Sequence, residues 1–533
     1  MTKLSLADKV ALVGKTATVL GRNTNQARGI AKFAIGFMKG TLGAGPDDSV
    51  YDRVELFHTD SVVCGLSALA LRTNAPTVLR EEALKYKWNN GATVFGSNVS
   101  VAPEKAIAAN SSAVREWDSN GTVFGFNGKL GEEHTAGEFG HNDFYPVVVA
   151  ACQIKKVDGK TAAKAMIMLD EIRGRLAEVF SLKSYRIDHV VHGAIASAAT
   201  YGALLDATEE QIESAIGMVV AHYIPWRAIR AGHQLSDSKG ASAALSTEVA
   251  IMSMQRSMQG FVGPADIFRN PEAIFRQFEP SPKGSEDSPF DLALSHSGSD
   301  FAVMGMHFKL GLYEHQSAGA LQGVINLLKG SPQLATSVDG IKSIKVVAYQ
   351  PAFGIIGDPA KRDPKTRQSA DHSMVFIVSR LLLKAIKLGP SKLAAASDGT
   401  NDLWKQLILT PADYSHDALT CKETRSLMER ISFEHGGKEY DEKYPDGIPT
   451  SVVITDAKGA VHDSKLVMYP SGHARNSTCD LSGILQSKFL KLASLAVDDA
   501  PALIKKLSGL KSKTASDIAS LYDCKLVLRD PID

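Results

Sequence analysis

The chain has 533 residues, of which 44% are hydrophobic and 22% charged, and its formal net charge at neutral pH is +1. This length suits two or three domains, each with its own core. The balanced charge provides no basic or acidic field that would point to nucleic acid or to a membrane as a partner.

The cysteines narrow the class of protein further. Five cysteines stand far apart in the sequence, with no C-x-x-C pair. These cysteines do not have the spacing of the usual zinc or iron–sulfur sites, and their wide separation argues against a disulfide framework. No run approaches the roughly 18 apolar residues that a membrane span requires. We therefore expect a reducing compartment, the cytoplasm.

The first 40 residues carry seven Lys or Arg and a single acid, Asp8. A mitochondrial leader has a charge of this kind, and with a leader the protein would lie in the mitochondrial matrix. An ordinary basic first helix has the same composition. The helix is the favoured alternative because Lys, rather than Arg, supplies most of the charge.

Helix follows helix in the first half of the chain. Apolar residues recur at helical spacing in 161–180, in 188–207 and again in 240–261. The segment 208–224 opens with Thr208-x-x-Gln211, which is a capping box. Alanine, serine and glycine are abundant on these segments, so the helices can pack closely. We predict a large all-helical domain whose first part is residues 1–275.

A polar stretch, residues 115–143, interrupts this helical part. It holds six glycines and few aliphatic side chains, and helical patterns flank it on both sides, at 102–114 and 144–156. Loops of this length inside a compact domain are usually functional or disordered. We predict a loop that presents polar side chains at a cleft.

The composition changes near residue 262, and residues 279–291 are rich in Pro, Gly, Ser and charge, as in a linker. Strands then occur among helices. Residues 341–350 predict a strand, 373–387 a helix and 451–470 a hairpin. We predict a smaller α+β lid domain over 276–475, and helices over 476–533 that return to the helical domain. The predicted fold class is mainly α, a large all-helical domain plus this lid.

Common cofactor motifs do not occur. The sequence has no P-loop, no G-x-S-x-G nucleophile elbow and no H-E-x-x-H zinc helix, and its 15 histidines show no recognised metal-ligand spacing. We expect no metal and no cofactor.

Polar groups gather beside glycine in four stretches. They contain Asp118, Asn120, Thr122 and His141; Asp188, His189 and His192; Arg227, Arg230, His233 and Lys239; and Glu314, His315 and Gln316. If the stretches converge, the arginines can grip carboxylates bidentately, while histidine and lysine act as base and acid.

Each stretch also has a structural interpretation. Asp118, before Ser-Asn-Gly, is typical of a helix cap or a turn. His189 and His192 can be hydrogen-bonded core histidines. Arg227 and Arg230 lie three apart, as on a solvated helix face, and Lys239 can simply begin a helix.

Seven segments in order resemble the 2-methylcitrate dehydratases of the MmgE/PrpD family. They are "TDSVVCGLSAL", "NNGATVFGSNVSVAPEKAIAANSSAVREWDSNGT", "GH" at 140–141, "IDHVVHGAIASAA", "WRAIRAGHQLSDSKGASAA", "YEHQSAGA" and "YPSGHAR". The resemblance runs from about residue 57 to residue 476. It implies a large helical domain with a smaller α+β lid, usually as a homodimer.

The resemblance also assigns expected site residues. Asp118, Thr122, His141 and Lys239 would sit at catalytic positions. The residues expected to bind substrate are Asn120, His189, Arg227, Arg230 and His315.

The chain departs from the family pattern inside these motifs. Gly121 stands where the family usually has Asp, and the stretch between Thr122 and His141 is longer than usual. His141 is followed by Asn-Asp instead of Pro-Ser, and the Gly-Asp pair that usually follows the lysine is absent after Lys239.

The function that this resemblance implies is a metal-independent hydro-lyase, which dehydrates a 2-methylcitrate-like tricarboxylate to a cis-aconitate-like product. One alternative is a family decarboxylase or epimerase acting on cis-aconitate or a related dicarboxylate. Another is a non-catalytic binding protein that kept the fold. The expected partners are a small tricarboxylate or dicarboxylate substrate and a second copy of the chain, with no nucleic acid and no membrane.

Overall fold

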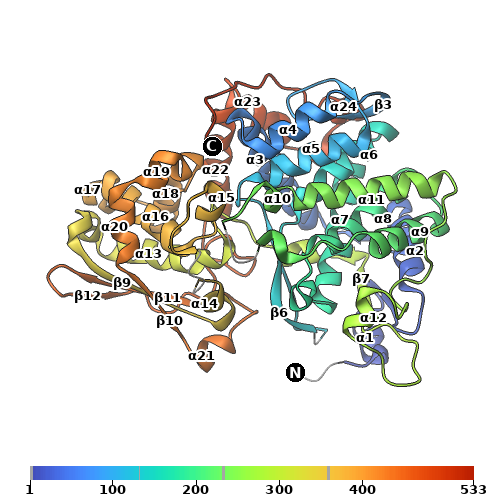
Figure 1. Cartoon of the computed structure of the whole chain (residues 1–533), viewed down its shortest axis with the longest axis horizontal. Coiled ribbons are helices and arrows are strands. Elements are labelled where there is room, and N and C mark those ends of the chain that lie inside the picture. The colour runs from blue at the N-terminus through green and yellow to red at the C-terminus, as the bar shows by residue number, and fades with distance from the viewer. Residues whose placement is uncertain (1–3, 131, 231–233, 357–360, 533) are drawn as a thin grey trace.

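The computed structural model describes residues 4–130, 132–230, 234–356 and 361–532, and it has two lobes (Figure 1). Helices fill the larger lobe, and the smaller lobe combines helices with a four-stranded sheet. The predicted fold class, mainly α with a smaller α+β part, is confirmed.

Long buried helices build the core of the larger lobe. Its helices are α1 (Leu6–Val13), α2 (Gln26–Lys39), α3 (Asp48–Ala70), α4 (Asn74–Ala83), α5 (Pro103–Glu116), α6 (Tyr145–Lys155), α7 (Gly159–Val179), α8 (Val190–Leu204), α9 (Glu209–His222), α10 (Asp237–Gly240), α11 (Ser242–Met258) and α12 (Ile274–Phe278). Helix α11 packs against α5, α8 and α9. The predicted capping box at Thr208 is present and starts α9.

Small residues allow this close packing. A Cβ atom built on Gly193 of α8 would lie 2.1 Å from the ring of Phe144. A Cβ atom on Gly202 would lie 2.7 Å from both Ile212 and Met254. A side chain at either position would displace these buried neighbours, so the small residues that the sequence places on α8 allow them to pack closely.

The described part of the larger lobe also contains four short strand pairs, of which the first two join segments far apart in the sequence. They are β1 (Ala17–Leu20) with β7 (Leu292–Ser295), β2 (Gly45–Pro46) with β8 (Ser297–Gly298), β3 (Lys87–Thr93) with β4 (Ser100–Val101), and β5 (Thr122–Asn127) with β6 (Glu132–Phe139). The β1–β7 pair is antiparallel, and Ser288 also hydrogen-bonds to Gln26. Residues 279–298 therefore stay with the larger lobe, and the change of lobe comes later than the predicted residue 276.

The polar stretch 115–143 is not one long loop, which corrects the sequence prediction. Helix α5 extends to Glu116, and β5 and β6 form an antiparallel hairpin from Thr122 to Phe139. Among the described residues of this stretch, 117–121, the turn at 128–130 and Gly140–His141 lie outside helix and strand, and the short helix η1 (Asn142–Phe144) follows. Thr122 also bridges to His307, which anchors the hairpin at its base.

The smaller lobe is built around a sheet with the strand order β10-β9-β11-β12. Its strands are β9 (Ile341–Ala348), β10 (Ile431–His435), β11 (Thr450–Asp456) and β12 (Val461–Asp463). The pair β9–β10 is parallel, whereas β9–β11 and β11–β12 are antiparallel. The predicted strand at 341–350 and the predicted hairpin at 451–470 are confirmed.

Helices surround this sheet. They are α13 (Ala318–Gly330), α14 (Gln350–Ile356), α15 (Arg367–Ala370), α16 (Met374–Leu388), α17 (Pro390–Ala394), α18 (Gly399–Leu407), α19 (His416–Thr420), α20 (Lys422–Glu429) and α21 (Lys438–Asp441). Helix α13 packs on β11, where Gly319 and Gly323 lie against Thr450 and Val452. Helix α16 confirms the helix predicted at 373–387.

The last helices pack against the larger lobe. They are α22 (Leu481–Ala496), α23 (Ala500–Leu507) and α24 (Ala515–Ala519), and α22 lies on α3. Beyond them, the backbone N–H of Arg529 donates to the carbonyl of Ala70 at 2.8 Å. Among the described helices, none alone has the length and apolarity of a membrane span; α3 and α4 meet that criterion only as a pair, across a 94° bend.

Candidate active site

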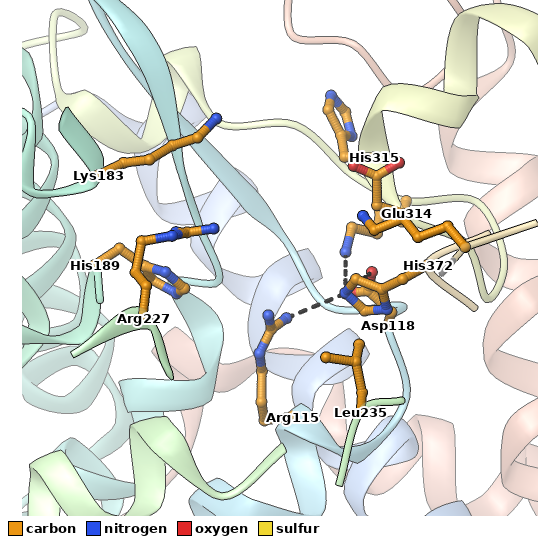
Figure 2. Close-up of a pocket in the computed structure, with 11 residues that line it drawn as sticks. Arg115, Asp118, Lys183, His189, Arg227, Leu235, Glu314, His315 and His372 are labelled. Atoms are coloured by element: carbon orange, nitrogen blue, oxygen red, sulfur yellow. Dashed lines mark hydrogen bonds and ion pairs between the residues drawn. The ribbon is translucent and has the colours of Figure 1, made fainter. Parts of the chain in front are cut away.

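A cavity lies where the two lobes meet, and polar side chains line most of it (Figure 2). Its described lining residues come from loops and helix ends of both lobes. They are Arg115, Asp118, Lys183, His189, Arg227, Leu235, Lys309, Glu314, His315, Lys361 and His372. Five of these residues are cationic and two are acidic, so the cavity suits an anion.

Asp118 is the centre of charge in this cavity. It follows the C-terminus of α5 and is 2% exposed. One of its oxygens lies 2.6 Å from Lys309 Nζ and 3.2 Å from Arg115 Nη1, and the other lies 3.2 Å from His372 Nε2. Burial opposes ionisation of this carboxyl, but the charges of Lys309, His372, Lys239 and Arg115 outweigh it and hold its pKa well below the usual value.

Lys488 of α22 holds the backbone beneath Asp118. Its buried ammonium donates to the carbonyls of Ser119 at 2.7 Å and Lys309 at 2.8 Å. The same nitrogen pairs with Asp60 of α3 at 2.6 Å. One side chain therefore fixes both segments that carry the Asp118–Lys309 ion pair.

The wall on the side of the larger lobe is made by two adjoining loops. Lys183 lies in the short helix η2 (Leu182–Tyr185), His189 caps α8, and Arg227 begins the short helix η3 (Arg227–Arg230). A β-bridge between Ile187 and Trp226 joins the two loops. In Figure 2, Lys183 and Arg227 extend from this wall toward Glu314 and His372 on the opposite side.

The opposite wall contains Glu314 and His315, where the short helix η5 (His315–Ser317) begins. Both are buried, and burial raises the pKa of Glu314. Burial, together with the charge of Lys309 and the neighbouring His473, holds the pKa of His315 well below its usual value. The His315 ring lies 5.2 Å, centroid to centroid, from that of His307.

The structure brings several of the sequence-predicted residues to the cavity. Asp118, His189, Arg227 and His315 line it. Lys239 is fully buried in α10, close enough to Asp118 and His372 to act on the charge of both.

Asn120 and Thr122 are buried and are not among the described lining residues. Asn120 accepts a hydrogen bond from Arg115 Nη1 at 2.8 Å, so it contacts the site through that arginine. The side chain of Arg230 lies outside the described part of the structure, so its expected role stays a prediction.

His141 is also absent from the described lining of the cavity. It is fully buried, its Nδ1 lies 3.1 Å from Asp170 Oδ1, and its ring packs edge-on against Phe57 at 4.2 Å. A Cβ atom on Gly121 would lie 2.2 Å from His141 Nε2. A side chain at position 121 would therefore meet this histidine. The catalytic role expected for His141 stays a prediction.

Sequence reasoning missed six residues of the cavity. Arg115, Lys183, Leu235, Lys309, Lys361 and His372 were not among the predicted site residues. Most lie in segments without a distinctive motif, and tertiary packing alone brings them together. One sequence feature could have pointed to His372: it follows Asp371 directly, and this acidic residue and histidine stand just before the N-cap of α16.

One described group has the donor atoms of a metal site. Asp118, Asp371 and His372 offer ligand atoms within 4.8 Å of one another. Lys309 and Arg115 already neutralise Asp118, so a bound cation would face two positive charges at close range. The arrangement is better suited to holding protons and anionic groups than to binding a cation.

Fold and cavity together define a class: a two-lobed protein with a cationic cavity between a helical lobe and an α+β lobe. Residues 30–286 match the MmgE/PrpD N-terminal domain. The family resemblance expected from the sequence is confirmed.

Known dehydratases resemble the chain along most of its length. It is 22% identical to an alkylcitrate dehydratase from a fungal species over 85% of both chains. It is 22% identical to the 2-methylcitrate dehydratase of Escherichia coli K12, over 80% of this chain and 82% of that one. It is 24% identical to the mitochondrial 2-methylcitrate dehydratase of Yarrowia lipolytica, over 84% of this chain and 80% of that one.

Proposed function

We propose that this protein is a hydro-lyase that removes water from a 2-methylcitrate-like tricarboxylate and yields the cis-aconitate-like unsaturated product. The names of the similar proteins support a lyase acting on a citrate-like substrate. Because the identity is low, the particular substrate is argued from the cavity.

The charge of the cavity is the observation that carries the proposal. Among the described lining residues, five cations outnumber two carboxylates by three. A tricarboxylate brings three negative charges and would balance this excess. Leu235, the one apolar side chain among those residues, suits a short alkyl substituent such as a methyl group.

The reaction needs this electrostatic environment. Water leaves from a tertiary carbinol, and a proton leaves the neighbouring carbon, which lies α to a carboxylate. Negative charge develops on that carboxylate, and preorganised cations in a buried site stabilise it. We propose that Lys309, Arg227 and Lys183 supply this stabilisation and that no metal takes part.

A turnover assay tests the proposal. Purified protein is incubated with 2-methylcitrate, citrate or cis-aconitate, with and without a chelator, while absorbance of the conjugated product and released CO₂ are followed. We expect dehydration of 2-methylcitrate that survives the chelator. Release of CO₂ from cis-aconitate would instead identify a decarboxylase. Loss of activity in the chelator that a divalent metal restores would exclude the metal-free reaction. No turnover of any of the three substrates would favour a binding protein.

A pair of variants connects the activity to the cavity. Arg227→Gln removes a guanidinium from the lining, and a lost charge-assisted hydrogen bond costs about 1.5–3 kcal/mol, so KM should rise roughly tenfold or more, and by more than kcat falls. Arg256→Gln, on the exposed face of α11, is the matched control and should leave both constants unchanged. Equal effects of the two substitutions would place substrate elsewhere.

A further inference from the structure

His372 stands between two carboxylates in the cavity. Its Nδ1 lies 2.5 Å from Asp371 Oδ1, and its Nε2 lies 3.2 Å from Asp118 Oδ2. The side chain is 13% exposed and lines the cavity, whereas Asp371 is 1% exposed behind it. Asp371 thus holds Nδ1 of the imidazole from behind, while Nε2 lies beside Asp118 in the cavity lining.

The Asp371–His372 dipeptide is held firmly by the backbone. It follows α15, whose N-terminus is capped by Thr366, and it precedes Ser373, which caps α16. The carbonyl of Asp371 accepts a hydrogen bond from the backbone N–H of Glu314 at 2.8 Å. The ring therefore has little freedom to leave its place beside Asp118.

Asp118 belongs to the larger lobe and His372 to the smaller one, so their contact forms only when the lobes meet. Nearby contacts hold this junction together. The backbone N–H of Leu235 donates to Ser369 Oγ at 2.8 Å, and Arg367 pairs with Glu116. The pair of lobes thus assembles the Asp118–His372–Asp371 array as one unit.

We propose that His372 is the acid–base residue of this cavity and that Asp371 is its positioning residue. The proposal rests on the proposed dehydration and names the group that handles its proton. Asp118 then acts as a fixed negative charge that stabilises the ring when it is protonated.

His372 alone can both accept the proton and return it. Neutral His372 takes the proton from the carbon α to a carboxylate, and the C–H electron pair forms the carbon–carbon double bond. The neighbouring C–O bond breaks, and the leaving oxygen takes the proton back from the imidazolium. One water is released and the protein returns to its starting state.

The charges around His372 prepare it for this role. Burial and the charge of Lys239 lower its pKa to about 4, against the opposing effects of Asp118 and Asp371. Lys309, Arg115 and Glu314 are the other charged groups close by in the cavity lining. The ring is neutral near pH 7 and can accept a proton, and an arriving trianion would raise its pKa and so strengthen it as a base.

Two substitutions test the proposal in the turnover assay with 2-methylcitrate. His372→Gln should lower kcat roughly 10²-fold or more, the usual size of an acid–base contribution, while KM changes little. Asp371→Asn removes a charge that raises the pKa of His372. The acidic limb of its kcat/KM profile should therefore move to lower pH, which a merely structural role would not cause.

The chain offers a matched control. His435 also pairs with an aspartate, Asp441, at 2.9 Å, but lies on the surface of the smaller lobe. His435→Gln should keep wild-type kcat and KM. Affinity for tricarballylate, a tricarboxylate without the hydroxyl group, shows whether each variant is folded, and if His372→Gln fails to fold, the pH profile of Asp371→Asn decides.

The outcomes separate this proposal from the proposed function. An active wild type with a near wild-type His372→Gln overturns the role of His372 and leaves the dehydratase standing. An active wild type whose acidic limb does not move in Asp371→Asn overturns the role of Asp371. A wild type that dehydrates none of the tricarboxylates overturns both proposals.

Discussion

Asp118 shows how one buried charge can organise a site. Three nitrogens, from Lys309, Arg115 and His372, lie within 3.2 Å of its two oxygens. Burying an isolated carboxylate is costly, so these partners are what allow it to stay ionised inside the protein. Its low pKa therefore has a consequence for stability as well as for ligand binding.

We predict that Asp118 makes part of the protein's stability depend on pH. The folded pKa lies below the ordinary value of 3.8, so this contribution is complete above that value and is lost as pH falls toward the folded pKa. At pH 7, Asp118→Asn should lower the free energy of unfolding by about 3–5 kcal/mol, because it leaves buried cations without their partner.

Urea unfolding of both proteins at pH 7 and at several values below pH 4 checks this prediction. The difference between wild type and Asp118→Asn should shrink as pH falls. A difference that stays constant across the acid range would show that Asp118 is not held ionised by its neighbours.

Individual site residues differ in how well the sequence could predict them. Asp118 and Arg227 lie in stretches that resemble family motifs, so they were found. Lys309 and His372 come from ordinary segments of the smaller lobe, and only packing brings them to Asp118. His141 was placed at the ligand by motif, but the sequence could not show that its ring fills the space beside Gly121.

Helix α22 illustrates how a distant element supports the site. It enters from the C-terminal region, far from Asp118 in sequence, and its Lys488 is fully buried. The ammonium satisfies two carbonyls and neutralises Asp60. No hydrophobic residue can replace these three contacts.

We predict that Lys488→Met destabilises the protein and disturbs the site together. Removing one partner of a buried ion pair costs about 3–5 kcal/mol, since Asp60 is left buried without its partner. The backbone at Ser119 and Lys309 also loses its anchor, so kcat should fall with the free energy of unfolding. Lys491→Met, an exposed lysine on the same helix, should change neither quantity.

Thermal unfolding and turnover of the two variants provide the measurement. If Lys488→Met keeps wild-type stability, the contacts of Lys488 contribute no net stabilisation. If its stability falls while kcat is unchanged at a temperature where it is folded, Lys488 does not position the Asp118–Lys309 pair.

Elements with strong local signals were predicted well. The capping box of α9, the strand β9 and the β11–β12 hairpin all carry local patterns that the fold preserves. The β5–β6 hairpin was missed because a glycine interrupts each strand and neither strand shows the β-branched alternation that marks a strand. Its pairing depends on contacts at its base, such as Thr122 with His307.

At the scale of the whole molecule, the two lobes are distinct in composition, and the sequence predicted both. Their boundary was placed too early because residues 279–291 look like a linker. In the structure, the strand that follows them pairs with β1 near the N-terminus. The local sequence around residues 279–291 does not indicate a pairing with a strand so far away in the chain. The expected homodimer and the cytoplasmic location stay predictions.

The central claim is that the cavity between the lobes binds a tricarboxylate beside His372. A crystal structure with tricarballylate, which cannot lose water, tests this claim most directly. We predict density for the ligand in the cavity, with its carboxylates against Lys183, Arg227 and Lys309 and its central carbon next to His372. Ligand density elsewhere, with this cavity unoccupied at saturating tricarballylate, would contradict the account.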